Sequence, residues 1–149
     1  MARKVHDRDR PDDHRRPDFE FCVHGRPVSA QTHNANGLAA WKRQIRTAAT
    51  TSWPAGQLTY TADVELRVTH YAEGRIADMD NLLKPIQDAL QGIVYVNDRV
   101  VKDVAGNWRD IDGRFRLRYI ARSLAEAFSD GREFLHIRIW RASGQEDLG

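Results

Sequence analysis

The sequence predicts one α+β domain, built from a small mixed or mostly antiparallel sheet of four to five strands and about three helices. The chain has 149 residues, a length that suits a single domain with a sizeable core. Apolar and polar residues alternate at Phe19–Val23 and again at Asp63–Tyr71, as in strands with one buried face. Between these segments, Leu38, Trp41 and Ile45 recur at helical spacing, so strands and helices are interspersed along the chain.

The predicted domain spans residues 19–141 and is flanked by two polar tails. Residues 1–18 contain almost nothing to bury, and their acidic side chains nearly offset their basic ones. We therefore expect a disordered, solvated tail there, with a basic arm that contacts DNA phosphates as the alternative. Residues 142–149 are also polar, and we expect a flexible C-terminal tail.

The first predicted helix covers residues 35–50. Its apolar stripe consists of Leu38, Trp41, Ile45 and Ala48. The opposite face carries Lys42, Arg43 and Arg46. These basic side chains are candidates for contacts with DNA phosphates, and the alternative is an ordinary solubilising face.

The strand at Asp63–Tyr71 leads through a loop to an acidic segment and a second helix. The loop contains Arg75, whose guanidinium could grip a substrate phosphate through two hydrogen bonds. The helix contains Pro85, which cannot donate a backbone hydrogen bond. We therefore predict that the helix starts near Lys84, with Pro85 at its first position, and that residues 78–83 form a turn.

The segment after this helix predicts two further strands. A short extended piece at residues 94–96 and a turn at residues 97–98 precede a strand at Val100–Trp108. Residues 110–113 are predicted to connect it to a return strand at residues 114–121. One face of the return strand carries Arg114, Arg116 and Arg118. These arginines are either a stripe that follows DNA phosphates or the solvated outer face of the sheet.

The last part of the domain predicts a short helix and a strand. The run Ser123-Leu124-Ala125-Glu126 has the form of a capping box, so a helix is expected to begin there and to stop before Gly131. A final strand is expected at Phe134–Trp140. Within it, His136 has apolar neighbours, and we interpret it as a packed residue and not as a catalytic one.

Composition limits the function classes. The net charge is only +2 and the pI is about 8.9, so a DNA-binding surface must come from local clustering of basic residues. The single cysteine, Cys22, lies in an apolar run and suits a buried position in a reducing, cytoplasmic setting. The sequence contains no apolar segment of signal-peptide or transmembrane length, so we expect no membrane association.

The chemistry is concentrated between Ala77 and Val104. If Asp78 and Asp80 lie on extended backbone, their carboxylates point the same way. Together with Asp98 they offer the oxygen ligands that Mg²⁺ prefers, with Mn²⁺ as a possible substitute. The scattered histidines and the lone cysteine fit no zinc spacing. The alternative interpretation makes Asp80 a helix N-cap and Asp98 a turn residue.

The whole string resembles the RusA family of Holliday-junction resolvases. The family pattern is D-x-D-N, a lysine four residues after the second aspartate, D-A-L at the end of that helix, and an aspartate before a valine-rich strand. The matching residues here are Asp78, Asp80, Asn81, Lys84, Asp88-Ala89-Leu90 and Asp98. This motif covers under a quarter of the chain, and weaker similarity in the order of elements extends from about Phe19 to Trp140.

The resemblance implies a homodimeric, Mg²⁺-dependent endonuclease that nicks branched DNA at four-way junctions. It implies that Asp78, Asp80 and Asp98 bind the metal and that Lys84 is the essential basic residue. The adjacent Asn81 and Asp88 are expected to support these residues, and a pair between Lys84 and Asp88 would hold the lysine toward the site. Many relatives have paired acids where this chain has Asn97-Asp98, which removes one charge from the site.

Three other interpretations use the same residues. A metal-dependent nuclease could act on flaps, forks or plain duplex, because junction preference comes from dimer geometry and surface shape. A nucleotide-sugar transferase also uses Asp-x-Asp, but it normally needs a larger domain, and no Gly-rich phosphate loop is present. A catalytically silent DNA-binding module could retain the fold, and Asn97 is the residue that favours this interpretation.

Overall fold

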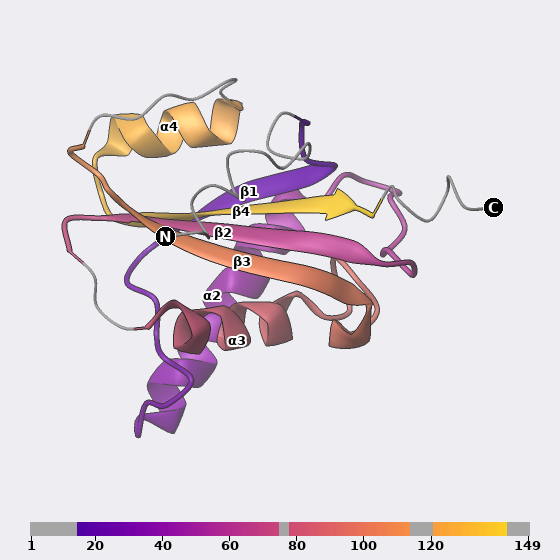
Figure 1. The fold of residues 1–149 in the computed structure, drawn as a ribbon, viewed down its shortest axis with the longest axis horizontal. Helices are drawn as coiled ribbons and strands as arrows, with labels where there is room; N and C mark the ends of the chain where they lie inside the picture. The colour runs from indigo at the N-terminus through magenta and orange to yellow at the C-terminus, as the bar shows by residue number, and fades with distance from the viewer. Residues whose placement is uncertain (1–14, 75–77, 114–120, 143–149) are drawn as a thin grey trace, which may run out of the picture.

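A four-stranded mixed sheet is the centre of the computed structural model, which describes residues 15–74, 78–113 and 121–142 (Figure 1). The strand order is β1-β4-β2-β3. Strand β4 pairs antiparallel with β1 and β2, whereas β2 and β3 run parallel. The strands are β1 (Phe19–His24), β2 (Val64–Ala72), β3 (Val101–Asp110) and β4 (Phe134–Arg141). The predicted α+β class with a mixed sheet is confirmed.

Helices cover both faces of the sheet. Helices α2 (Ala35–Ser52) and α3 (Met79–Leu90) lie on one face, and α4 (Arg122–Asp130) lies on the other (Figure 1). Because β2 and β3 are parallel, the chain must cross over between them, and α3 supplies this crossover. A short 3₁₀ helix, η2 (Asp98–Val100), then leads into β3. Within the described residues, none of these helices is both long and apolar enough to cross a membrane.

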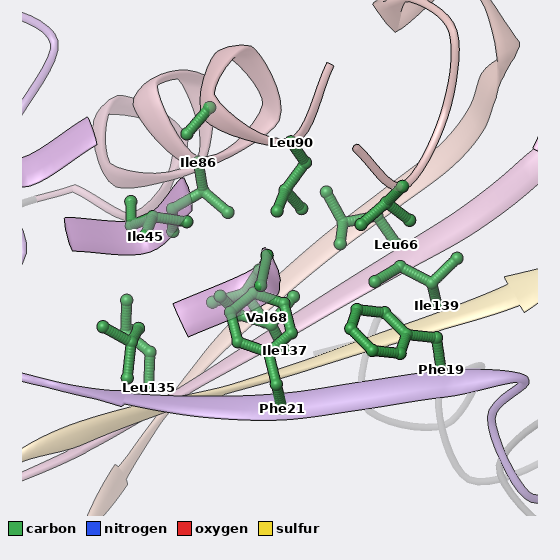
Figure 2. Close-up of a cluster of buried hydrophobic side chains, with 14 of the residues drawn as sticks. Phe19, Phe21, Ile45, Leu66, Val68, Ile86, Leu90, Leu135, Ile137 and Ile139 are labelled. Atoms are coloured by element: carbon green, nitrogen blue, oxygen red, sulfur yellow. The ribbon is translucent and has the colours of Figure 1, made fainter. Parts of the chain in front are cut away.

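The larger core lies between the sheet and helices α2 and α3, and Figure 2 shows its central side chains. Alternate residues of β1, β2 and β4 point into it, as the strand patterns predict, whereas β3 contributes only the partly buried Val101. The labelled residues are Phe19, Phe21, Ile45, Leu66, Val68, Ile86, Leu90, Leu135, Ile137 and Ile139. On α2, Trp41 and Ile45 are buried, which confirms the predicted apolar stripe at these two positions.

Helix α4 covers a smaller cluster on the opposite face. Its residues Leu124 and Ala127 pack with Tyr71 and Phe134, whose rings stack at 4.9 Å between centroids. The helix ends at Gly131, which has φ of 74°, as predicted.

The predicted capping box at the start of α4 is wrong. The helix begins at Arg122 and its N-cap is Ala121, so Ser123 already lies inside the first turn. Glu126 pairs with Arg122 at 3.2 Å, one turn earlier on the same helix, and in the part of the chain that the structure describes α4 has no side-chain cap at its N-terminus.

His136 of β4 is a packed residue, as predicted. It is 4% exposed, and its Nε2 lies 2.8 Å from Glu20 Oε1 on the neighbouring strand β1. Burial lowers the pKa of this imidazole, and the Glu20 carboxylate opposes that effect.

Residues 15–18 belong to the predicted disordered tail, yet they lie against β4. The indole Nε1 of Trp140 donates to the Arg15 carbonyl at 2.9 Å. The Asp18 amide donates to the Ile139 carbonyl at 2.9 Å, and the Arg141 amide donates to Asp18 Oδ2 at 2.6 Å. The prediction of disorder is therefore wrong for residues 15–18, because the C-terminal end of β4 offers backbone partners to this segment.

Candidate active site

Helix α3 begins earlier than predicted. Its first residue is Met79 and its N-cap is Asp78, whose backbone is extended (φ −62°, ψ 135°). The prediction of a turn at residues 78–83 and a helix start near Lys84 is therefore wrong. Asp80 lies in the first turn and not at the N-cap, so the simple capping interpretation of Asp80 is also wrong.

The early start changes how Asp78 and Asp80 are presented. Successive helical residues are rotated by about 100°, so these two side chains do not share a direction as they would on a strand. Both are exposed, and within the described part of the chain the Asp78 carboxylate makes no capping hydrogen bond. Negative charge is stabilised at this helix end by the orphan N–H groups and the helix dipole.

Pro85 lies in the interior of α3 without breaking it. Because proline has no N–H, the carbonyl of Asn81 loses its usual partner four residues ahead. The amide of Ala30, in the segment between β1 and α2, donates to this carbonyl at 2.8 Å. A tertiary hydrogen bond thus replaces the missing helical one, and it ties the loop after β1 to the first turn of α3.

Gly106 of β3 allows α3 to approach the sheet closely. A Cβ placed on Gly106 would lie 2.7 Å from Met79 Sδ and 3.2 Å from Leu83 Cδ2, and nearer still to Met79 Cγ. Met79 lies between Asp78 and Asp80 in the sequence. This contact therefore sets the distance between the sheet and the first turn of α3, the acidic turn that carries both aspartates. The pattern of β3 alone did not reveal this function of Gly106.

Lys84 joins α3 to the turn before β3. Its Nζ lies 3.1 Å from Asp88 Oδ1 and 3.9 Å from Asp98 Oδ2. The predicted pair with Asp88 is confirmed, and the structure brings Lys84 and Asp98 together from separate elements. Asp80, Lys84 and Asp88 follow each other at intervals of four residues, so they lie along one face of α3.

The three candidate metal ligands do not gather at one point in the structure. Asp98 lies beside Lys84 and Asp88, and about 12 Å of helix separates Asp80 from Asp88. Among the described residues, no three histidine, cysteine or acidic side chains are close enough to hold one ion together. The oxygen donors suit Mg²⁺, which typically takes one or two carboxylates and completes its shell with water and substrate phosphate.

Asn97 and Gln91 fix the turn that carries Asp98. Asn97 is the N-cap of η2, and its Oδ1 accepts from the Arg99 amide at 2.9 Å. The Asp98 amide donates to Gln91 Oε1, at the end of α3, at 3.3 Å. Many family members have an acidic residue at position 97. Here the side-chain amide of Asn97 instead caps the turn that presents Asp98.

Tyr95 packs beneath this part of the site. It is fully buried, and its hydroxyl donates to the Gln87 carbonyl of α3 at 2.7 Å. Burial raises the pKa of Tyr95 above its ordinary value, and the nearby negative charges of Asp88 and Asp98 raise it further. The phenol therefore remains a neutral donor under Asp88 and Asp98.

Two of the three basic residues predicted on α2 face α3. Lys42 Nζ lies 3.6 Å from Asp88 Oδ2. Arg46 Nη1 donates to the carbonyls of Ala89 and Gln91, at 2.9 and 3.0 Å, and so caps the C-terminus of α3. Arg43 is exposed on the same helix. The other predicted DNA contacts lie outside the described residues: Arg75, Arg114, Arg116 and Arg118.

A comparison with protein families assigns the class. Residues 16–118, well over half of the chain, match the family described as Endodeoxyribonuclease RusA. The match places the chain in a class of endodeoxyribonucleases, enzymes that hydrolyse phosphodiester bonds within a DNA strand. The chain belongs to the RusA family. No curated protein sequence matches the chain significantly.

Proposed function

We propose that the chain is a Mg²⁺-dependent nuclease that resolves four-way DNA junctions by paired, symmetric nicks. The observation that carries the proposal is the position of the Lys84 ammonium, which is 3.9 Å from the Asp98 carboxylate and one helical turn from Asp80. An exposed cation between carboxylates from two elements suits a phosphodiester, which carries one negative charge and gains more during hydrolysis. The family match supports the reaction class.

In this proposal Asp78, Asp80 and Asp98 are the metal-binding carboxylates. Because they do not gather at one point, a bound ion would take one or two of them directly and complete its shell with water and DNA phosphate. The chemistry supplied by the bound ion is withdrawal of charge from the scissile phosphate and activation of water near neutral pH. Mn²⁺ is expected to substitute, since it accepts the same oxygen ligands. The backbone amide of Asn81 donates to the Asp78 carbonyl at 3.1 Å. This hydrogen bond stabilises the turn that carries the Asp78 and Asp80 carboxylates.

Lys84 is assigned the role of stabilising the negative charge that accumulates on the phosphate during hydrolysis. Water attacks phosphorus, one phosphorus–oxygen bond breaks, and negative charge builds on the phosphate oxygens and on the leaving oxygen. Lys84 is 56% exposed, so its ammonium can reach a DNA backbone while Asp88 restrains it. Of the predicted DNA contacts on α2, the exposed Arg43 remains a candidate for binding a neighbouring phosphate.

Junction resolution requires two symmetric cuts, and one chain of this size carries one such site. We therefore expect a homodimer with two-fold symmetry, in which each subunit cuts one strand. Sedimentation of the purified protein, alone and with a junction, measures this association directly.

The deciding experiment compares a synthetic four-way junction with a flap, a fork and a linear duplex of matched sequence. Each is incubated with Mg²⁺, Mn²⁺ or chelator. We expect paired nicks on the junction, dependent on metal. Asp80→Asn should lower the rate by about two orders of magnitude or more, whereas Asp103→Asn, at an exposed aspartate of β3, serves as the control.

The outcomes separate the alternatives. Equal cleavage of all four substrates would retain the chemistry and reject junction specificity. Junction binding without cleavage in either metal would support a silent DNA-binding module. Direct titration with Mn²⁺, followed by its paramagnetic signal, tests the metal site independently of activity, and unchanged affinity in Asp80→Asn would reject the assigned ligand.

A further inference from the structure

A row of alternating charges crosses the contact between α2, α3 and η2. Its members are Lys42, Asp88, Lys84 and Asp98, in that spatial order. The successive nitrogen–oxygen distances are 3.6, 3.1 and 3.9 Å. Asp88 is the shared member, because its Oδ2 faces Lys42 and its Oδ1 faces Lys84.

We propose that Lys42 is a positioning residue for Lys84, acting through Asp88, and not a contact with DNA phosphate. This inference rests on the function proposed for Lys84 and extends it to a residue on another helix. Lys42 occupies one oxygen of Asp88, which leaves the other oxygen to hold Lys84. The Lys84 ammonium is then restrained on the side of Asp98.

The position of Lys42 supports this role. It lies four residues before Arg46, so both side chains leave the same face of α2. Arg46 Nη1 is bonded to two carbonyls at the end of α3, which identifies that face as the contact with α3. The Lys42 side chain is 35% exposed, against 56% for Lys84, so it is the less accessible of the two lysines for a DNA backbone.

The charge balance explains why Lys42 matters for Lys84. Without Lys42, both Asp88 oxygens are available to Lys84, and the ammonium is drawn toward Asp88 and away from Asp98. Without Asp88, the two lysines face each other with no carboxylate between them, and their repulsion releases Lys84 into solvent. Each change misplaces the same ammonium, and removal of Asp88 misplaces it more.

Kinetics with a double-mutant cycle test the proposal. We expect Asp88→Asn to lower kcat by about tenfold or more, and Lys42→Met to lower it by about fivefold, with little change in KM. The double variant should be no slower than Asp88→Asn, because Lys42 acts only through Asp88. Lys42→Arg retains the charge and should recover most of the rate.

Arg43→Met supplies the comparison for a direct DNA contact on the same helix. That change should raise KM and reduce the salt dependence of binding, since it removes one phosphate-attracting charge. If Lys42→Met behaves in the same way, with kcat retained and an effect that adds to that of Asp88→Asn, Lys42 is a DNA contact and the proposal is wrong.

A spectroscopic measurement decides the question even if the protein cuts none of the DNA substrates. The lysines of the chain are Lys4, Lys42, Lys84 and Lys102, so their ε-methylene NMR signals can be assigned by substitution. In the metal-free protein, Lys42→Met should shift the Lys84 signal without sharpening it, and Asp88→Asn should both shift and sharpen it, while Lys102 on β3 stays constant. An unchanged Lys84 signal in Lys42→Met would overturn the positioning role. Absence of cleavage by the wild-type protein would instead overturn the proposed function.

Discussion

Substitution of Gly106 by alanine tests the close packing of α3 on the sheet. The added Cβ would overlap the middle of the Met79 side chain and press on Leu83 Cδ2. Met79 must then adopt another rotamer or push its helical turn outward, and overpacking of this kind costs about 1–3 kcal/mol. Alanine also restricts the unfolded chain, which offsets about 0.4–1 kcal/mol. We expect a net loss of about 1–2 kcal/mol.

Unfolding in urea, followed by circular dichroism, measures this loss. For a domain of this length it corresponds to a fall in Tm of about 2–8 °C. The diagnostic measurement repeats Gly106→Ala in a Met79→Ala background, where the obstructing side chain is absent. There the same substitution should be neutral or slightly stabilising.

Two results would refute the reasoning. Gly106→Ala could be as stable as the wild-type protein, which would mean that Met79 moves aside at no cost. Alternatively, the loss could be equal in both backgrounds, which would locate the effect in the β3 backbone and not in its contact with α3.

Two further predictions concern the C-terminus of α3 and the partly buried thiol of Cys22. Arg46→Met removes the side chain that caps the C-terminus of α3. It should lower the free energy of unfolding, measured by urea titration, by about 2 kcal/mol. An equal loss in Arg43→Met, at an exposed arginine of the same helix, would contradict the capping role of Arg46. Burial, assisted by the negative charge of Glu20, raises the pKa of the Cys22 thiol from 9.0 to about 12. Above pH 9 the unfolded chain therefore loses this proton while the folded chain keeps it, so stability should fall by up to about 1.4 kcal/mol per pH unit between pH 9 and 10. Cys22→Ala should reduce this slope and leave the part that comes from tyrosines whose pKa is also raised, such as Tyr95. An equal slope in both proteins would show that Cys22 does not contribute to it.

Local periodicity was sufficient to predict most of the elements. The stripe that includes Trp41 and Ile45 located α2 to within two residues at its end, and the alternation after Asp63 located β2. These predictions hold because α2 buries one stripe and the first half of β2 buries one face, and burial imposes the periodicity that the sequence displays.

The errors share a physical cause, which is a partner distant in sequence. The start of α3 was misplaced because Pro85 normally excludes a helix interior, and the compensating donor is the amide of Ala30, far earlier in the chain. Lys42 and Arg46 have the pattern of a solvated basic face, and only the packing of α2 on α3 shows that they face Asp88 and the end of α3. No local rule contains these contacts.

In the candidate site, too, contacts within one element were predicted from the sequence, whereas most of those that depend on the three-dimensional fold were not. The i,i+4 spacing of Lys84 and Asp88 predicted their pair, because both lie on one helix. The approach of Asp98 to Lys84 agrees with the predicted grouping, whereas the shared direction of Asp78 and Asp80 depended on an extended backbone that the helix replaces. The structural function of Asn97, as the cap of η2, could not be separated from the loss of a charge in the sequence alone.

The hydrogen bond between the Ala30 amide and the Asn81 carbonyl makes one backbone proton a reporter for the acidic turn. This proton can exchange with solvent only when the segment after β1 separates from α3 or the first turn of the helix opens. Its exchange rate therefore measures how often the turn that carries Asp78 and Asp80 departs from its folded geometry. Because the reporter lies on another segment, it can be followed in variants of either aspartate without altering the group that is observed.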